Sequence, residues 1–151
     1  MIHISNRKNL ALHLFVILLT ACSNPNQNNI ANEVKLPLAE ISGLSNATGV
    51  HVYYLHQQRR CNTCVKIEQA IHKALSCYNS DNKPLYHDVL LTTAQGKQLA
   101  EEFKVSYSGI VIVSKMGKTN LTNQAFLLAP IYPDSLHKLL VTTFDQHSKF
   151  K

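Results

Sequence analysis

The sequence has no tryptophan, and it has only five glycines and five prolines among 151 residues. This scarcity excludes collagen-like and low-complexity chains, which are rich in glycine and proline. Charged residues make up 16% of the chain and hydrophobic residues 45%, the balance of a globular domain rather than of a disordered segment. The length is enough for one domain of ordinary size.

Basic residues outnumber acidic residues by 15 to 9, but they are scattered and form no run interleaved with aromatic residues. The sequence therefore gives no support for nucleic-acid binding. It also has no Gly-x-Gly-x-x-Gly loop, so we expect no nicotinamide or flavin cofactor.

The N-terminal segment, residues 1–21, has the pattern of a lipoprotein signal peptide. Two basic residues precede an apolar run over 10–19, which is shorter than the roughly 20 residues of a membrane span and has the length of a signal-peptide core. The run ends in Leu19-Thr20-Ala21-Cys22, which resembles the lipobox of bacterial lipoproteins. That resemblance implies cleavage before Cys22 and acyl chains, such as palmitate, on this cysteine. The alternative is a soluble secreted protein in which Cys22 is incidental.

We therefore expect a protein of the cell envelope that faces the periplasm and is held to a membrane by its lipid. Ser23 follows the cysteine, which favours the outer membrane over the inner one, because lipoproteins with a residue other than Asp there are usually sorted outward. Loss of residues 1–21 lowers the formal net charge from +6 to +4, since two basic residues and no acidic residue are removed. Residues 22–49 are expected to form the lipidated N-terminus and a linker, and residues 50–147 the folded domain.

The pattern after the linker alternates strands and helices. Apolar and β-branched runs predict strands, and apolar residues at helical spacing predict helices. The expected order is strand 50–55, helix 61–76, strand 85–91, a helix from Thr92 or Thr93 to 103, strand 110–113, strand 119–125 and a helix from Pro133. This order predicts an α/β domain with a mixed central sheet and helices on both faces.

The strongest chemical feature is Cys61-Asn62-Thr63-Cys64, at the predicted junction of the first strand and the first helix. At a helix start, Cys61 meets free backbone N–H groups and the positive end of the helix dipole, and both favour the thiolate. Arg59 and Arg60 are expected to add positive potential. Cys64 lies one turn later, where it can close a disulfide onto Cys61 and release a trapped partner. This spacing predicts a thiol–disulfide oxidoreductase with Cys61 as nucleophile and Cys64 as resolving thiol, acting on periplasmic protein thiols or disulfides.

Other interpretations of this pair remain open. The oxidising periplasm permits a purely structural disulfide. Thiolates also bind zinc or Cu(I), so the pair could belong to a metal carrier with His56 as a third ligand. A third alternative is a non-catalytic accessory subunit. His56 itself is more often a satisfied or exposed histidine than a ligand.

Two further residues bear on the site. Glu68 lies four residues after Cys64 on the same helical face, where it could take the proton of Cys64, although a solvated helix glutamate is an equal alternative. Cys77 is thirteen residues beyond Cys64, or about 20 Å along a helix, so we expect no shared site. It is predicted to be a buried small residue or a free thiol.

The residues of the site carry a resemblance to a known family. The order of elements over 50–146 is similar to that of a thioredoxin-like domain. More closely, residues 53–68 resemble small bacterial thioredoxin-like proteins of the family called nitrophenyl compound nitroreductase subunit, ArsF type. The matching residues are Tyr53-Tyr54-Leu55-His56, Arg60-Cys61-Asn62-Thr63-Cys64 and Lys66-Ile67-Glu68.

The chain departs from ordinary thioredoxins in two ways. Arg60 takes the place of the aromatic residue that usually precedes the first cysteine. In addition, Ser108 or Gly109 stands where thioredoxins have a cis-proline before the third strand. Loss of that proline removes a rigid edge for substrate and leaves the cysteines more open to metal.

Overall fold

The computed structural model describes residues 48–149, which form a four-stranded sheet and four helices. The predicted signal peptide and nearly all of the predicted linker, with Cys22, lie outside the described residues. The strands are β1 (His51–His56), β2 (Leu85–Leu90), β3 (Gly109–Ser114) and β4 (Gly117–Asn120). The helices are α1 (Asn62–Leu75), α2 (Ala94–Phe103), α3 (Thr122–Leu128) and α4 (Pro133–Ser148).

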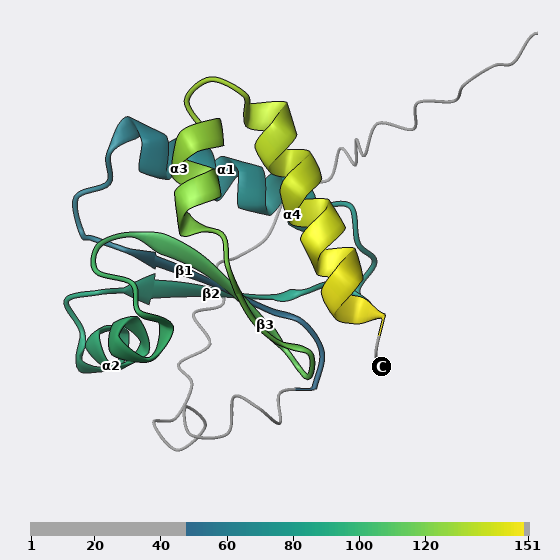
Figure 1. The fold of residues 1–151 in the computed structure, drawn as a ribbon, viewed down its shortest axis with the longest axis horizontal. Helices are drawn as coiled ribbons and strands as arrows, with labels where there is room; N and C mark the ends of the chain where they lie inside the picture. Colours follow the sequence, from purple (N-terminus) through teal and green to yellow (C-terminus); the bar gives the residue numbers. More distant parts are fainter. Residues whose placement is uncertain (1–47, 150–151) are drawn as a thin grey trace, which may run out of the picture.

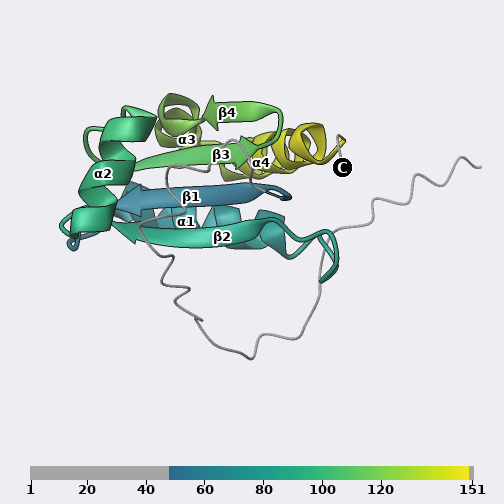
Figure 2. The ribbon, with the colours of Figure 1, turned by 90° about the horizontal axis from the view of Figure 1, so that it is seen from below.

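The sheet has the strand order β2-β1-β3-β4, which Figure 2 shows with the strands side by side. β1 pairs with β2 in parallel and with β3 in antiparallel orientation, and β3 pairs with β4 in antiparallel orientation. The predicted mixed sheet and α/β class are therefore confirmed. The topology is compatible with a thioredoxin-like fold.

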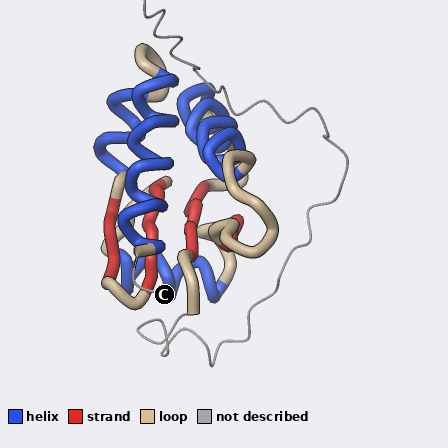
Figure 3. Tube along the Cα trace, turned by 90° about the vertical axis from the view of Figure 1, so that its right-hand side faces the viewer, coloured by secondary structure: helices blue, strands red, loops and turns tan. Residues whose placement is uncertain are grey.

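Alternating residues of the sheet pack into two hydrophobic clusters. Val52 and Tyr54 of β1 belong to a cluster with residues of α1, α3 and α4. Tyr53 and Leu55 belong to a second cluster with Leu99 and Phe103 of α2. Successive side chains of a strand point to opposite faces, and Figures 1 and 3 show α2 across the sheet from the other three helices.

The second cluster contains a buried histidine. The ring of His87 stacks on Tyr53 with centroids 4.4 Å apart, and its Nε2 lies 3.0 Å from Nδ1 of His51. His87 is only 5% exposed, and burial, helped by His51, lowers its pKa to about 4. This face of the sheet therefore holds a neutral imidazole at pH 7.

Most predicted elements are present within a residue or two of their expected ends. Thr93, of the two candidate caps, is the N-cap of α2, and its Oγ1 accepts a hydrogen bond from the Gly96 amide at 2.9 Å. Pro133 occupies the first turn of α4, as predicted. Among residues 48–149, no helix is long and apolar enough to cross a membrane.

The predicted strand over 119–125 is wrong in its second half. β4 ends at Asn120, whose Oδ1 accepts a hydrogen bond from the Thr122 amide at 2.9 Å and turns the chain. Thr122 then begins α3, and Leu121 and Ala125 are both buried in the cluster shared with α1 and α4. Apolar residues four apart fit one face of a helix, and here this spacing prevails over strand propensity.

Candidate redox site

The two cysteines of the motif form a disulfide where β1 leads into α1. Cys61 is the N-cap residue of α1 with extended backbone angles, and its Cα lies 5.0 Å from that of Cys64. Its Sγ accepts a hydrogen bond from the Cys64 amide at 3.1 Å. Cys61 is exposed, whereas Cys64 is 7% exposed and is one of the buried residues of α1. The pair thus has one sulfur that a partner can reach and one that is covered.

The surroundings of Cys61 favour a negative charge on its sulfur. The first turn of α1 has free amide groups, and one of them already points at the sulfur. No acidic residue lies in that turn to oppose the dipole. In the reduced protein, these groups stabilise a Cys61 thiolate relative to the thiol.

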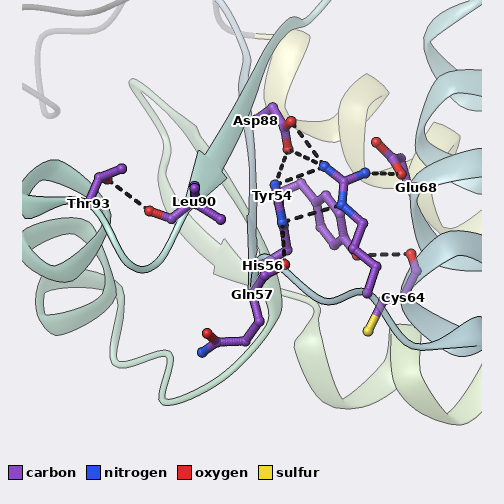
Figure 4. Close-up of polar contacts among 9 residues, drawn as sticks. Tyr54, His56, Gln57, Cys64, Glu68, Asp88, Leu90 and Thr93 are labelled. Carbon is purple, nitrogen blue, oxygen red and sulfur yellow. Dashed lines mark hydrogen bonds and ion pairs between the residues drawn. The ribbon is translucent and has the colours of Figure 1, made fainter.

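Arg60 joins three elements next to the cysteine pair in sequence, and Figure 4 marks its contacts with dashed lines. Its Nη1 donates to the carboxylate of Glu68 on α1, and its Nη2 donates to Oδ2 of Asp88 on β2 at 3.2 Å. Nη2 also lies 3.0 Å from Nε2 of His56, at the end of β1. The hydrogen bond to Glu68 raises the pKa of Arg60, so the guanidinium is held charged by its carboxylate partners. We call Arg60, Glu68, Asp88 and His56 the Arg60 cluster.

His56 is a buried, satisfied histidine. It is 5% exposed, its Nε2 lies 2.6 Å from Oδ1 of Asp88, and its Nδ1 lies 2.9 Å from the carbonyl oxygen of Gln57. Both ring nitrogens therefore have partners other than the cysteines. Within the described part of the chain, no three His, Cys, Asp or Glu side chains are grouped so that they could hold a metal ion.

Tyr54 connects the sheet directly to the cysteine pair. Its buried hydroxyl donates to the carbonyl oxygen of Cys64 at 2.8 Å. Burial, followed by the nearby charge of Glu68, raises the pKa of Tyr54 to about 12, so the hydroxyl keeps its proton and remains a donor. The bond fixes the first turn of α1 over β1.

Glu68 lies in the second turn of α1, on the helix that carries Cys64. Its side chain is 21% exposed and is paired with Arg60. Glu68 is therefore a partly buried, paired residue and not a freely solvated helix glutamate. Its role as a proton acceptor stays a prediction.

Tyr54 and Asp88 are site residues that the sequence analysis did not identify. The parallel register places Tyr54 directly opposite Asp88, so both side chains face the helix that carries the cysteines. Alternation along the first strand could have placed Tyr54 with His56 on one face. Asp88 could have been added only with the register between the two strands.

The loop before β3 lies at the same end of the sheet, because Gly109 pairs with Leu55 of β1. A Cβ on Gly109 would lie 2.5 Å from Oγ1 of Thr122 and 2.8 Å from a methyl of Val105. Close packing therefore accounts for the glycine at position 109. Tyr107 in this loop is 78% exposed.

Cys77 lies after the other end of α1 and is the free cysteine among the described residues. Its Sγ lies 3.7 Å from the carbonyl oxygen of Lys73 and 3.7 Å from Nε2 of His137 on α4. It is partly exposed and contributes nothing to the disulfide site.

No protein-family model matches this chain, and no curated protein sequence matches it either. The resemblance to the ArsF-type family therefore rests on the motif over residues 53–68. In the structure this motif forms the end of β1, the following loop and the first two turns of α1. Membership of that family stays a prediction.

Proposed function

We propose that this protein is a thiol–disulfide oxidoreductase of the cell envelope in which Cys61 is the nucleophile and Cys64 the resolving thiol. The observation that carries the proposal is the asymmetry of the pair. Cys61 is exposed at the N-cap of α1 and accepts an amide hydrogen bond, whereas its disulfide partner Cys64 is 7% exposed. A structural disulfide requires neither an exposed sulfur nor a helix N-terminus beneath it.

The proposed reaction exchanges one disulfide for another. The Cys61 thiolate attacks a sulfur of the partner disulfide, forming a mixed disulfide while the partner's second sulfur leaves with the electron pair and takes up a proton. Cys64 then loses its proton and attacks the Cys61 sulfur. The Cys61–Cys64 disulfide forms, and the remaining partner sulfur leaves as a thiolate. The partner is reduced by two electrons and this protein is oxidised; the reverse sequence oxidises the partner.

Glu68 is the proposed acceptor for the Cys64 proton. Glu68 lies one turn beyond Cys64 on α1, and its carboxylate accepts a hydrogen bond from Arg60. Glu68→Gln should therefore slow the second step, the release of the partner, more than the first step. The matched change Glu101→Gln, at an exposed residue of α2, should leave both steps unaffected.

The proposed location is the periplasmic side of a membrane, most simply the outer membrane, through lipid on Cys22. It is supported by Leu19-Thr20-Ala21-Cys22 in the sequence. Cys22→Ser should release the protein from the membrane fraction or block its processing. A mature, membrane-bound form of this variant would overturn the proposed anchor without affecting the proposed chemistry.

The oxidoreductase proposal is tested by trapping mixed disulfides in cells. Cys64→Ala removes the resolving thiol, so adducts with partner proteins should accumulate on Cys61 and disappear with reductant. Cys61→Ala and Cys77→Ser in the Cys64→Ala background serve as controls. Only Cys61→Ala should abolish the adducts. Adducts that persist without Cys61, or none at all, would contradict the proposal.

A further inference from the structure

The segment of chain around Cys61 carries positively charged residues and no negatively charged ones. Residues 57–67 contain Arg59, Arg60 and Lys66 and no acidic residue. The carboxylates of Glu68 and Asp88 approach this segment, but both bind Arg60. Counting these two carboxylates against its three cations, the segment keeps a net charge of +1. Its exposed cationic side chains are those of Arg59 and Lys66.

The two remaining cations do not belong to the cluster. Arg59 is exposed and makes no hydrogen bond or ion pair with the described residues. Lys66 is exposed, and its Nζ donates only to the carbonyl oxygen of Pro130, at 3.4 Å. The loop before β3, at the same end of the sheet, adds exposed Lys104 and no acidic residue over 104–109.

Apolar side chains lie among these cations. Val65, one turn after Cys61 on α1, is 38% exposed, and Tyr107 in the loop before β3 is 78% exposed. A peptide laid across Cys61 can therefore gain apolar contact close to the sulfur. The charged side chains that residues 57–67 contribute around that contact are all positive.

We propose that the partner of Cys61 is a peptide disulfide flanked by aspartate or glutamate. This inference rests on the proposed function and names its substrate class. Arg59 and Lys66 attract the flanking carboxylates, and they repel a cationic peptide before its sulfur reaches Cys61. Arg60 contributes little to this selection, because its charge is matched by Glu68 and Asp88.

The test uses three synthetic peptides of equal length, each with one cysteine joined to thiopyridine. The cysteine is flanked by glutamates, glutamines or lysines. When Cys61 attacks the peptide sulfur, the new S–S bond forms as the bond to thiopyridine breaks, and the leaving group takes the electron pair and then a proton. Its absorbance gives the rate. The full chain carries Cys22→Ser and Cys77→Ser, so the two site cysteines are its only thiols.

Each rate is first divided by the rate at which a small free thiol reacts with the same peptide. At low ionic strength, the corrected rate for the glutamate peptide should be at least about five times that for the lysine peptide. The ratio should fall towards one in about 0.5 M salt, because exposed charges are screened. Arg59→Gln with Lys66→Gln should remove most of the preference. Lys83→Gln with Lys115→Gln, an equal charge change at the opposite end of the sheet, should keep it.

The outcomes separate this inference from the function beneath it. Reaction with the glutamine peptide at Cys61, but equal corrected rates for all three peptides, would overturn the acidic preference and leave the oxidoreductase intact. No reaction with any peptide would overturn both. A preference that survives Arg59→Gln with Lys66→Gln would show that these cations are not its source.

Discussion

The two ends of α1 present cysteines to opposite environments. At the start, Cys61 accepts a hydrogen bond from a backbone amide, and Arg59 beside it is exposed. Just past the end, Cys77 lies beside carbonyl groups, with its Sγ 3.7 Å from the Lys73 carbonyl oxygen. Amide hydrogens and the positive end of the helix stabilise a thiolate, whereas carbonyl oxygens at the other end favour the protonated thiol.

From this difference we expect position along the helix, more than the presence of a thiol, to decide which cysteine is activated. Both Cys61 and Cys77 are at least partly exposed, so access alone does not separate them. The supporting structure also differs. Tyr54 and the Arg60 cluster join the start of α1 to β1 and β2. At the other end, the Cys77 sulfur lies near the Lys73 carbonyl oxygen and His137 of α4.

The largest expected effect is in alkylation. In the reduced protein, Cys61 should react at least about tenfold faster than Cys77 at pH 7, because its pKa is lowered below the usual value of about 8.5 for a free thiol. Single-cysteine variants, alkylated over a range of pH, give the apparent pKa of each. A Cys61 value at or above that of a free thiol would leave no activated nucleophile and would favour a structural disulfide.

The next effect compares two tyrosines. Tyr54→Phe removes the buried hydroxyl that holds the Cys64 carbonyl, which should cost about 1–2 kcal/mol of unfolding free energy. Tyr78→Phe, at the other end of α1, removes a part-buried hydroxyl that bonds to exposed Asp145 and lies 3.1 Å from the Val141 carbonyl oxygen. It should cost about 0.5 kcal/mol. Urea unfolding of both variants measures the difference. Equal losses would mean that the Tyr54 hydrogen bond does not stabilise the site more than a surface contact does.

A smaller effect separates the neighbouring arginines. Arg60→Gln breaks contacts to α1 and β2 and should lower the unfolding free energy by about 1 kcal/mol. The expected loss is small because Asp88 is 45% exposed, and solvent weakens its ion pair. Arg59→Gln should change the unfolding free energy by less than about 0.5 kcal/mol, since Arg59 is exposed and unpaired among the described residues. Thermal or urea unfolding checks both variants. A larger loss for Arg59→Gln would contradict this assignment of the two side chains.

The sequence was sufficient for much of the fold and for the position of the cysteine pair. Strand runs, helical spacing and Pro133 are local signals, and each placed an element near its observed bounds. The strand predicted over 119–125 failed because Leu121 and Ala125 also fit a helix face, and only contact with α1 and α4 decides between the two. Local patterns do not contain that contact.

The polar support of the site was harder to predict, because it depends on contacts between distant segments. Arg60 was expected to direct its charge to Cys61, but it is held by Glu68 and by Asp88, which is 28 residues away in sequence. The partnership with Asp88 follows from the parallel register of β1 and β2. A one-residue shift would move Asp88 to the other face of the sheet, so the cluster could not be deduced without the register.

The smallest expected effect tests whether His137 activates Cys77. Burial, followed by the charge of Lys73, lowers the pKa of His137, so its ring is neutral at pH 7 and supplies no positive charge to a thiolate. Its Nε2, 3.7 Å from the sulfur, accepts the thiol hydrogen in one neutral tautomer and donates to the sulfur in the other, and neither brings a positive charge. His137→Ala should therefore change the alkylation rate of Cys77 by less than about threefold, and that of Cys61 not at all. If Cys77 instead slowed tenfold and lost a low apparent pKa, the pair would be an activated thiol, and position on the helix would not by itself explain the contrast between the two ends of α1.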